Sequence, residues 1–310
     1  MTSVDANKQL VMRYFDTIWN SGDFEREPEF VAQDCIVHAP PMPGVPAGIA
    51  GPLMIVGTFR EALPDLRLTN IVVIGAGDRV IQRWIVHGSH TGAELFGVPP
   101  QGTSLVLSGI NEFRIEDGKI AERWGTMDVL GMLQQLGVAP DPQQSPPPDD
   151  AEETETRQAA GYTMSAEEQE LGRRSHDEFM VGGREETVDE VYAPDAVIFG
   201  RHIPPEQRRG TEGFKSYGRV LRTAFPDIEI VHDSFVTEGD FQAFRWTFHG
   251  THQGPMFGAP PTAKPVSIEG YDILRIRDGK IVEAWIEQDM IGLLQQIGLA
   301  PEPAESAQPA

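Results

Sequence analysis

The sequence has almost no cysteine and no long apolar run. Cys35 is the only cysteine among 310 residues, so no disulfide can form within the chain, which fits a reducing compartment. No stretch approaches the roughly 18 consecutive apolar residues that a membrane-spanning helix needs. The first residues also lack the basic and apolar segments of a secretory signal. We therefore expect a cytoplasmic protein.

Positive charge is scarce as well. The chain has 25 Lys and Arg residues against 47 Asp and Glu residues, which gives a formal net charge of -22. Such a surface repels the phosphates of nucleic acids and the anionic head groups of lipids. We therefore expect no nucleic-acid partner and no membrane partner.

Several signatures of enzyme chemistry are missing. No G-x-S-x-G nucleophile motif, no G-x-G-x-x-G nucleotide motif and no zinc pattern occurs. The pairs His87/His90 and His249/His252 are each three residues apart, and residues three apart on a strand point to opposite faces. They are therefore poorly placed to bind one metal ion. The sequence predicts neither a metal nor a cofactor.

What the sequence does contain is a long internal repeat. The segment "ALPDLRL" from Ala62 returns as "AFPDIEI" from Ala224, and "RIEDGKI" from Arg114 returns as "RIRDGKI" from Arg275. The offset between the copies stays almost constant from one pair to the next. Because solenoid repeats have periods of only about 20–50 residues, an offset of half the chain indicates a duplicated domain. We predict one domain at residues 1–140 and a second at 164–302.

The segments outside the two copies are rich in proline and acidic residues. Residues 141–163 have no apolar period and are expected to form a linker, and residues 303–310 a disordered tail. A flexible linker of this length keeps the two domains at a high local concentration. We therefore predict an internal pseudo-dimer of the two domains within a single chain.

Each copy is predicted to begin with helices. Residues 6–22 have apolar residues at helical spacing, and in the second copy Ser165 and Glu168 form the pattern of a capping box. A short helix is expected at 30–34, or 188–195 in the second copy. A longer helix then ends before the proline of "PD" in each copy.

Strands are predicted to follow the helices. Strand-like runs occupy residues 67–75, 79–91, 104–115 and 119–126, and the Asp-Gly pair of "EDGK" indicates a tight hairpin between the last two. Helices followed by antiparallel strands indicate an α+β fold. We expect each copy to be a cone, in which a curved antiparallel sheet wraps around the N-terminal helices and encloses an apolar pocket.

These motifs resemble a known family. "PDLRL", "RWIVHGSHTG", "FGVPP", "INEFRIEDGKIAERW" and the closing D-x-x-G-x-L-Q-Q-L-G are similar to the SnoaL-like polyketide cyclases, also called ester cyclases, of the NTF2-like superfamily. The resemblance covers roughly residues 8–140 and 166–301. It implies two cone-shaped α+β barrels and secondary metabolism. It also implies ring closure of a polyketide ester by aldol condensation, without metal or cofactor.

The resemblance implies a catalytic aspartate in each copy. Asp128 and Asp289 match the family position, because each has a tryptophan four residues before it and a glycine three residues after it. In the family, this residue removes a proton between carbonyl groups and then protonates the new alkoxide. Aspartate is also among the best helix N-caps, and each residue directly precedes a short apolar segment. The two roles remain open and are compatible.

A further catalytic candidate differs between the copies. His38 occupies a place where family members have a pocket histidine, whereas the second copy has Phe199 there. His202 follows Phe199 closely and is a possible substitute. Asp272, which matches Asn111, is a candidate second acid of the second copy. These differences suggest that the two pockets do not share the same chemistry.

The remaining candidates for substrate binding are aromatic and basic. They are His90, His252, Trp84, Trp246, Trp124, Trp285, Arg60 and Arg222. For the histidines the alternative is a hydrogen-bonding role at the rim, and for the tryptophans it is plain core packing. For the arginines it is an electrostatic contact with a helix C-terminus or an ion pair with Asp65 and Asp227.

Together with the resemblance, these residues favour an enzyme that uses acid–base chemistry on a hydrophobic carbonyl compound, and the resemblance implies, most concretely, a polyketide cyclase. Two alternatives stay open. One is a protein that binds or sequesters a hydrophobic small molecule without turnover. The other is a related isomerase, hydratase or epoxide hydrolase, since these reactions also use a carboxylate in a pocket.

Overall fold

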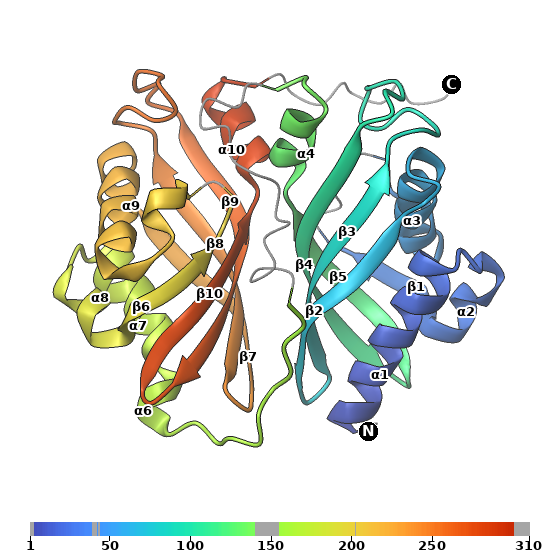
Figure 1. Ribbon diagram of the computed structural model, residues 1–310, viewed down its shortest axis with the longest axis horizontal. Coiled ribbons are helices and arrows are strands. Elements are labelled where there is room, and N and C mark those ends of the chain that lie inside the picture. Colours follow the sequence, from blue (N-terminus) through green and yellow to red (C-terminus); the bar gives the residue numbers. More distant parts are fainter. Residues whose placement is uncertain (1–2, 39–41, 43, 140–154, 202, 301–310) are drawn as a thin grey trace. The chain divides into compact units, whose positions relative to one another are not determined.

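The computed structural model describes residues 3–38, 42, 44–139, 155–201 and 203–300 (Figure 1). The chain divides into two compact units between Gln158 and Ala159. We call the part before this point unit 1 and the part after it unit 2. His202, one of the candidate residues, lies outside the described ranges. Within those ranges, no helix is both long and apolar enough to cross a membrane.

Unit 1 begins with helices, as its sequence predicts. Ser3 caps the first helix, because its hydroxyl accepts a hydrogen bond from the Ala6 amide. This helix continues as a π-helix, in which one extra residue per turn widens the coil. The helices are α1 Val4–Tyr14, η1 Phe15–Asn20, η2 Phe24–Arg26, α2 Glu27–Phe30, α3 Ala50–Ala62 and α4 Val129–Gln135.

One mixed sheet forms the rest of unit 1. Its strands are β1 Val31–Val37, β2 Arg67–Ala76, β3 Arg79–Ser89, β4 Ser104–Glu116 and β5 Lys119–Met127, in the order β1-β5-β4-β3-β2. The four predicted strands pair antiparallel, whereas β1 pairs parallel with β5. The short helix expected at residues 30–34 is therefore wrong: the chain turns into a strand at Val31, because the free edge of β5 offers it hydrogen-bond partners.

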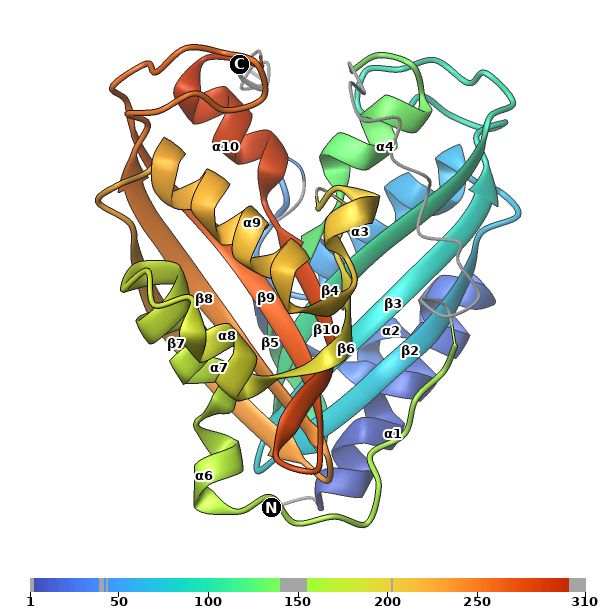
Figure 2. The ribbon, with the colours of Figure 1, turned by 60° about the vertical axis from the view of Figure 1, so that its left-hand side comes forward.

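Unit 2 repeats this order (Figure 2). Its sheet has the order β6-β10-β9-β8-β7, with β6 parallel to β10. The capping box at Ser165 and Glu168 is confirmed. The elements are α6 Ala166–Gln169, α7 Leu171–Arg174, η3 Ser175–Val181, α8 Glu186–Val191, β6 Tyr192–Phe199, η4 Pro205–Gln207, α9 Gly210–Ala224, β7 Glu229–Glu238, β8 Phe241–Thr251, β9 Pro265–Arg277, β10 Lys280–Gln288 and α10 Met290–Ile297.

The hairpins predicted from the Asp-Gly pairs are confirmed. Asp117 and Gly118 have φ angles of 50° and 74°, and Asp278 and Gly279 have φ angles of 51° and 74°. Two successive positive φ angles match the right-handed twist of the flanking strands, which is why Asp-Gly is favoured here. These turns fix the register of the last two strands in each unit, and with it the residues that face the core.

One face of each sheet packs against the helices, and we call it the inner face. In unit 1, Phe15 of η1 meets Phe113 of β4 with ring centroids 5.9 Å apart. In unit 2, His176 of η3 meets Phe244 of β8 edge to face at 5.0 Å. Because side chains alternate along a strand, every second residue of β2–β5 and β7–β10 shares this inner face, apart from shifts at bulges.

The described end of the expected linker contacts both units. The Arg157 amide donates to the Ile71 carbonyl at 2.7 Å, along β2 of unit 1. The Ala160 amide donates to Asp240 Oδ1 at 2.8 Å in unit 2. The boundary between the units thus falls inside the segment expected to be a linker. The internal pseudo-dimer stays a prediction.

Candidate acid–base site

A pocket opens on the inner face of unit 1. The space between its walls is about 400 Å³ when the open solvent at its mouth is counted, and most of the walls are apolar. Trp84, one of the expected pocket residues, lines it. The complete lining is Trp19, Ile55, Phe59, Leu66, Trp84, Val86, Leu107, Arg123, Gly125, Thr126 and Met127.

A row of polar side chains crosses the inner face of unit 1 beside this pocket. Asn70, Gln82, Asn111 and Arg123 come from four successive strands. Gln82 Nε2 donates to Asn70 Oδ1, and Asn111 Nδ2 donates to Gln82 Oε1 at 3.0 Å. Arg123 Nη2 donates to Asn111 Oδ1 at 2.9 Å. We call these four residues the amide ladder. Its amides do not titrate and its guanidinium stays protonated, so the ladder itself offers no general acid or base.

The same positions of unit 2 carry different chemistry. Asp272 replaces Asn111, since it pairs with Phe244 of β8 as Asn111 pairs with Gln82 of β3. His232 replaces Asn70, and both precede the bulge of the edge strand. The repeat also aligns His176 with Phe15 and Ala284 with Arg123. Unit 2 thus has an acid and two imidazoles where unit 1 has amides, an aromatic ring and a cation.

The acid and the imidazoles of unit 2 form one hydrogen-bonded chain. His176 Nε2 lies 3.1 Å from Asp272 Oδ2, and His176 Nδ1 lies 3.1 Å from His232 Nε2. Trp246 Nε1 donates to the other carboxylate oxygen, Asp272 Oδ1, at 2.9 Å. A carboxylate can only accept, so His176 donates from Nε2 to Asp272, and in the tautomer with its proton on Nε2 it accepts at Nδ1 from His232. We call His232, His176, Asp272 and Trp246 the unit 2 relay.

Burial sets the electrostatics of the relay. Asp272 and His176 are only 5% and 6% exposed, whereas His232 is half-buried. Burial lowers the pKa of His232 below its ordinary value, and the nearby His176 lowers this pKa further. His232 is therefore neutral at neutral pH. The relay leads from a titratable group within reach of solvent to a carboxylate in the core.

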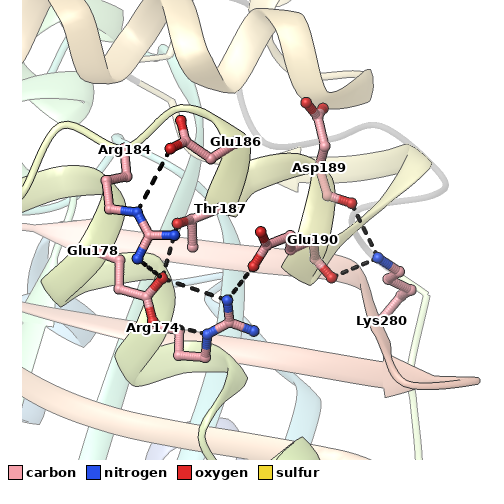
Figure 3. Close-up of polar contacts among 8 residues, drawn as sticks. All are labelled: Arg174, Glu178, Arg184, Glu186, Thr187, Asp189, Glu190 and Lys280. Atoms are coloured by element: carbon pink, nitrogen blue, oxygen red, sulfur yellow. Dashed lines mark hydrogen bonds and ion pairs between the residues drawn. The ribbon is translucent and has the colours of Figure 1, made fainter.

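An ion-pair network holds the helix that carries His176 (Figure 3). Arg174 Nε donates to Glu178 Oε1 at 2.9 Å, and Arg174 also pairs with Glu190 of α8. Thr187 Oγ1 donates to Glu178 Oε2 at 2.9 Å. Arg174 and Glu178 flank His176 on the chain, where α7 passes into the π-helix η3. These contacts fix the turn from which His176 points to the sheet.

Two buried tyrosines also surround Asp272. Burial raises the pKa of Tyr217 to about 12, and the charge of Asp272 adds to this effect. The Tyr217 hydroxyl accepts from Gln288 Nε2 at 3.3 Å, and the Tyr192 hydroxyl lies 3.0 Å from Ser175 Oγ. In unit 1 the places of Tyr217, Gln288 and Tyr192 are all taken by apolar side chains: Ile55, Met127 and Val31. At these three positions the interior of unit 2 is thus more polar than that of unit 1.

Comparisons with known proteins identify the fold. The family description "SnoaL-like polyketide cyclase" matches twice, at residues 9–136 and at residues 170–297. The chain belongs to this family. Its SnoaL-like domains follow one another in tandem, which agrees with the repeat in the sequence and with two sheets of identical order.

Solved structures of SnoaL-like proteins each match about half of the chain. TsrD from Streptomyces laurentii is 28% identical and covers 44% of this chain and 99% of its own, with a TM-score of 0.40. IdmH from Streptomyces antibioticus, described as a proposed polyketide cyclase, is 31% identical and covers 42% and 98%, with a TM-score of 0.38. AclR from Streptomyces galilaeus, described as a proposed hydroxylase, is 27% identical and covers 45% and 85%, with a TM-score of 0.40. A comparison with curated proteins gave no match.

The aspartates singled out by the SnoaL-like resemblance are both helix N-caps. Asp128 Oδ1 accepts from the Gly131 amide at 2.7 Å, and Asp289 Oδ1 accepts from the Gly292 amide at 2.8 Å. Burial raises the pKa of Asp289 above its ordinary value, which its cap hydrogen bond only partly offsets. The glycine three residues after each aspartate is thus a cap partner, and the cap explains part of the family motif.

The structure places His38 and Trp124 away from the unit 1 pocket. Trp124 alternates along β5 with Arg123 and Gly125, which line the pocket, so it faces the opposite side of the sheet. His38 stacks on Trp124 with ring centroids 4.3 Å apart, and its Nε2 lies 2.8 Å from Glu122 Oε2. The expectation that these two residues serve the pocket is therefore corrected.

Unit 2 has the same arrangement without the histidine. Phe199 stacks on Trp285 with centroids 5.4 Å apart, and Trp285 is fully buried. Trp285 alternates with Ala284 and Ile286 and so lies on the outer face as well. The contrast between His38 and Phe199 therefore concerns the outer packing and says nothing about catalysis.

The other candidates make local structural contacts. His90 Nε2 lies 3.1 Å from the Ala93 carbonyl, and His252 Nδ1 lies 3.0 Å from Thr262 Oγ1, so both histidines organise the loop after their strand. Arg60 Nη1 donates to the Trp19 carbonyl at 2.5 Å, and Arg222 Nη1 donates to the Phe179 carbonyl at 2.8 Å. Both arginines thereby satisfy carbonyl groups of the π-helices.

Sequence reasoning identified Asp272 and Trp246 but missed the histidines. His176 lies in a helix and His232 on an edge strand, so no local motif joins them to Asp272. The repeat itself carried the signal. When the two copies are aligned, Phe15 falls on His176 and Asn70 falls on His232. At both positions the first copy has a side chain that does not titrate and the second copy has a histidine.

Proposed function

We propose that this SnoaL-like protein is a cofactor-free acid–base enzyme whose chemistry takes place in unit 2. Its substrate is a hydrophobic carbonyl compound, and its reaction is the intramolecular aldol cyclisation of a polyketide-like ester. The observation that supports this proposal most strongly is the buried pair of His176 and Asp272, oriented by Trp246. Buried carboxylates with an imidazole partner are expensive to keep and are concentrated at functional sites.

The proposed reaction begins with proton removal. Asp272 takes a proton from the carbon between two carbonyl groups, and the Tyr217 hydroxyl donates a hydrogen bond to the enolate oxygen. The enolate carbon attacks a second carbonyl of the same molecule, forming the carbon–carbon bond and an alkoxide. A second acid then gives a proton to the alkoxide and regains one from Asp272 through solvent, so atoms and charge balance and the enzyme is restored without an oxidant. His176 and Trp246 hold the carboxylate in place throughout.

Asp289 is the proposed donor of the returning proton. Its raised pKa keeps more of the carboxyl group protonated than an exposed aspartate would be. Asparagine caps helices as well as aspartate does. Asp289→Asn is therefore expected to leave the melting temperature within a few degrees of the parent and to slow ring closure of a linear poly-β-keto methyl ester about a hundredfold. Ring closure at the parent rate would reduce Asp289 to a cap, which is also the proposed role of Asp128 in unit 1.

Deuterium exchange tests the proton-removal step without knowledge of the natural substrate. Ethyl 2-benzylacetoacetate is a hydrophobic β-keto ester with one exchangeable proton between its carbonyl groups. In D₂O, the protein is expected to accelerate loss of this proton signal in the NMR spectrum above the rate in buffer. Binding of the ester without acceleration would instead favour the sequestering alternative. Addition of water to an epoxide or alkene probe of similar size, seen as a mass increase by mass spectrometry, would favour the related hydrolase or hydratase reactions.

The pH dependence of this exchange reports on His232. A protonated His232 places a positive charge next to His176 and perturbs the hydrogen-bonded chain that holds Asp272. Because the pKa of His232 is lowered, the exchange rate is expected to rise with pH and to level off with a midpoint below about 6.5, the ordinary value for histidine. His232→Asn installs the residue found in unit 1 and should remove this inflection. An unchanged profile in that variant would exclude His232 from the relay.

A further inference from the structure

One of the side chains that line the unit 1 pocket, Trp84, has an indole N–H without a partner among the described residues. Trp84 is only 6% exposed, and its Nε1 is buried. In unit 2, the matching Trp246 donates to Asp272. Unit 1 has lost this acceptor, because Asn111 directs its oxygen to Arg123 instead. A buried donor without a partner destabilises the folded state, so a ligand that accepts from it gains affinity.

Arg123 lines the same pocket. Asn111 Oδ1 accepts from its Nη2 at 2.9 Å and holds it in place. Gly125 leaves room for this contact, since a Cβ at that position would come within 2.4 Å of Asn111 Oδ1. Unit 2 has Ala284 and Ile286 at the places of Arg123 and Gly125, so both parts of the arrangement belong to unit 1 alone.

The charge of Arg123 also reaches the core beside the pocket. Burial raises the pKa of Cys35 to about 11, and Arg123 acts in the opposite direction on this pKa. A guanidinium offers N–H groups in a planar fork that matches the two oxygens of a carboxylate. The indole N–H adds another donor, and Trp19 and Phe59 supply flat apolar walls.

We infer that the unit 1 pocket is a binding site for a hydrophobic carboxylate, held by Arg123 and by the Trp84 indole N–H, with no proton transfer of its own. The amide ladder orients the cation and contains no titratable base. The aromatic walls receive the apolar body of the ligand. This inference does not depend on the reaction in unit 2, because it rests on residues that unit 2 lacks or uses differently.

Calorimetry with 2-naphthoate tests the inference on the full chain. We expect one molecule bound per chain, and binding at least about tenfold tighter than that of 2-naphthamide, which has the same shape without the charge. Arg123→Met is expected to abolish the preference for the acid. Trp84→Phe keeps an aromatic wall, removes only the N–H, and is expected to weaken naphthoate binding about five- to tenfold.

Trp246→Phe is the matched control in unit 2. It removes the corresponding indole N–H there and is expected to leave naphthoate binding unchanged. Equal affinity for the acid and the amide, no binding at millimolar concentrations, or a loss on Trp246→Phe alone would overturn the inference. If Arg123→Met does not fold, as judged by circular dichroism, the pair Trp84→Phe and Trp246→Phe decides. Deuterium exchange that fails while naphthoate still binds would refute only the proposed enzyme reaction.

Discussion

Asp272→Asn is expected to slow deuterium exchange of ethyl 2-benzylacetoacetate about a thousandfold, within the range known for the loss of a general base. Asparagine keeps the size of the side chain and its oxygen can still accept from Trp246 Nε1. It cannot take a proton from the substrate. The fold should therefore survive while the rate falls, and NMR in D₂O measures the rate directly.

Asp195→Asn is the control for this prediction. Asp195 is exposed on β6 of the same unit, so the same chemical change is made away from the relay. Its exchange rate should equal that of the parent. Exchange at the parent rate in Asp272→Asn would contradict the assignment of Asp272 as the general base. If Asp289→Asn then abolished the exchange, the base would be Asp289 instead.

Glu27→Gln is expected to stabilise unit 1 at alkaline pH. Glu27 is only 1% exposed, and Tyr14 Oη donates to its Oε1 over a long 3.5 Å. Its other oxygen, Oε2, is buried without a partner among the described residues. Burial therefore raises the pKa of Glu27 to about 7 from an ordinary 4.5. At the equivalent position unit 2 has Val188.

The sign of the effect follows from proton linkage. The folded state binds the Glu27 proton more tightly than the unfolded state does. The free energy of unfolding is therefore highest at low pH, where Glu27 is protonated in both states. It falls as the pH rises from about 4.5 to about 7, by about 3 kcal/mol in total. Glutamine stays neutral and removes this loss. At pH 8, Glu27→Gln should therefore increase the free energy of unfolding of unit 1 by about 2–3 kcal/mol.

This change in the free energy of unfolding is measured by denaturant titration, in which hydrogen exchange of peptides from unit 1 reports the unfolding of that unit. Glu29→Gln is the matched control on the same helix, because Glu29 is exposed and pairs with Arg26 at 2.8 Å. Glu29→Gln should leave the free energy of unfolding of unit 1 at pH 8 close to that of the parent protein. A parent-like pH dependence in Glu27→Gln would show that Glu27 ionises freely in the folded state.

Much of the architecture was predictable because it depends on local patterns. The Asp-Gly pair at Asp117 requires positive φ angles and specifies its hairpin, and the Ser165 box specifies a helix start. Strand β1 was not predictable in this way. Its residues Gln33 and Asp34 are both exposed, so no apolar alternation reveals the strand. It exists because β5 offers an unpaired edge, which is a property of the folded sheet.

The candidate site was only partly predictable for the same reason. Asp128 and Asp289 stand in a clear motif, and part of that motif is explained by their caps. His38 aligned with a pocket position. However, side chains alternate between the two faces of β5, and Trp124, on which His38 stacks, points to the outer face. His176 becomes part of the site only through the π-helix and through a sheet residue 96 positions away. Comparison of the two copies position by position finds it, whereas a search for motifs does not.

The two copies therefore differ at the polar positions of their inner faces. The hairpins, the caps and the order of strands are repeated, and these features preserve the fold. The inner faces differ in the sign of their charge: Arg123 in unit 1 against Asp272 in unit 2. On this account one copy binds and the other transfers protons, which gives a duplicated fold two separate tasks.

The most direct test of this account gives unit 2 the side chains of unit 1. The triple variant His176→Phe, His232→Asn and Asp272→Asn is compared with the parent in deuterium exchange of ethyl 2-benzylacetoacetate, and its fold is checked by circular dichroism. We predict exchange at the rate of buffer alone, with 2-naphthoate still bound in unit 1. Exchange at the parent rate in the folded variant would contradict the account, because the base would then lie outside the unit 2 relay.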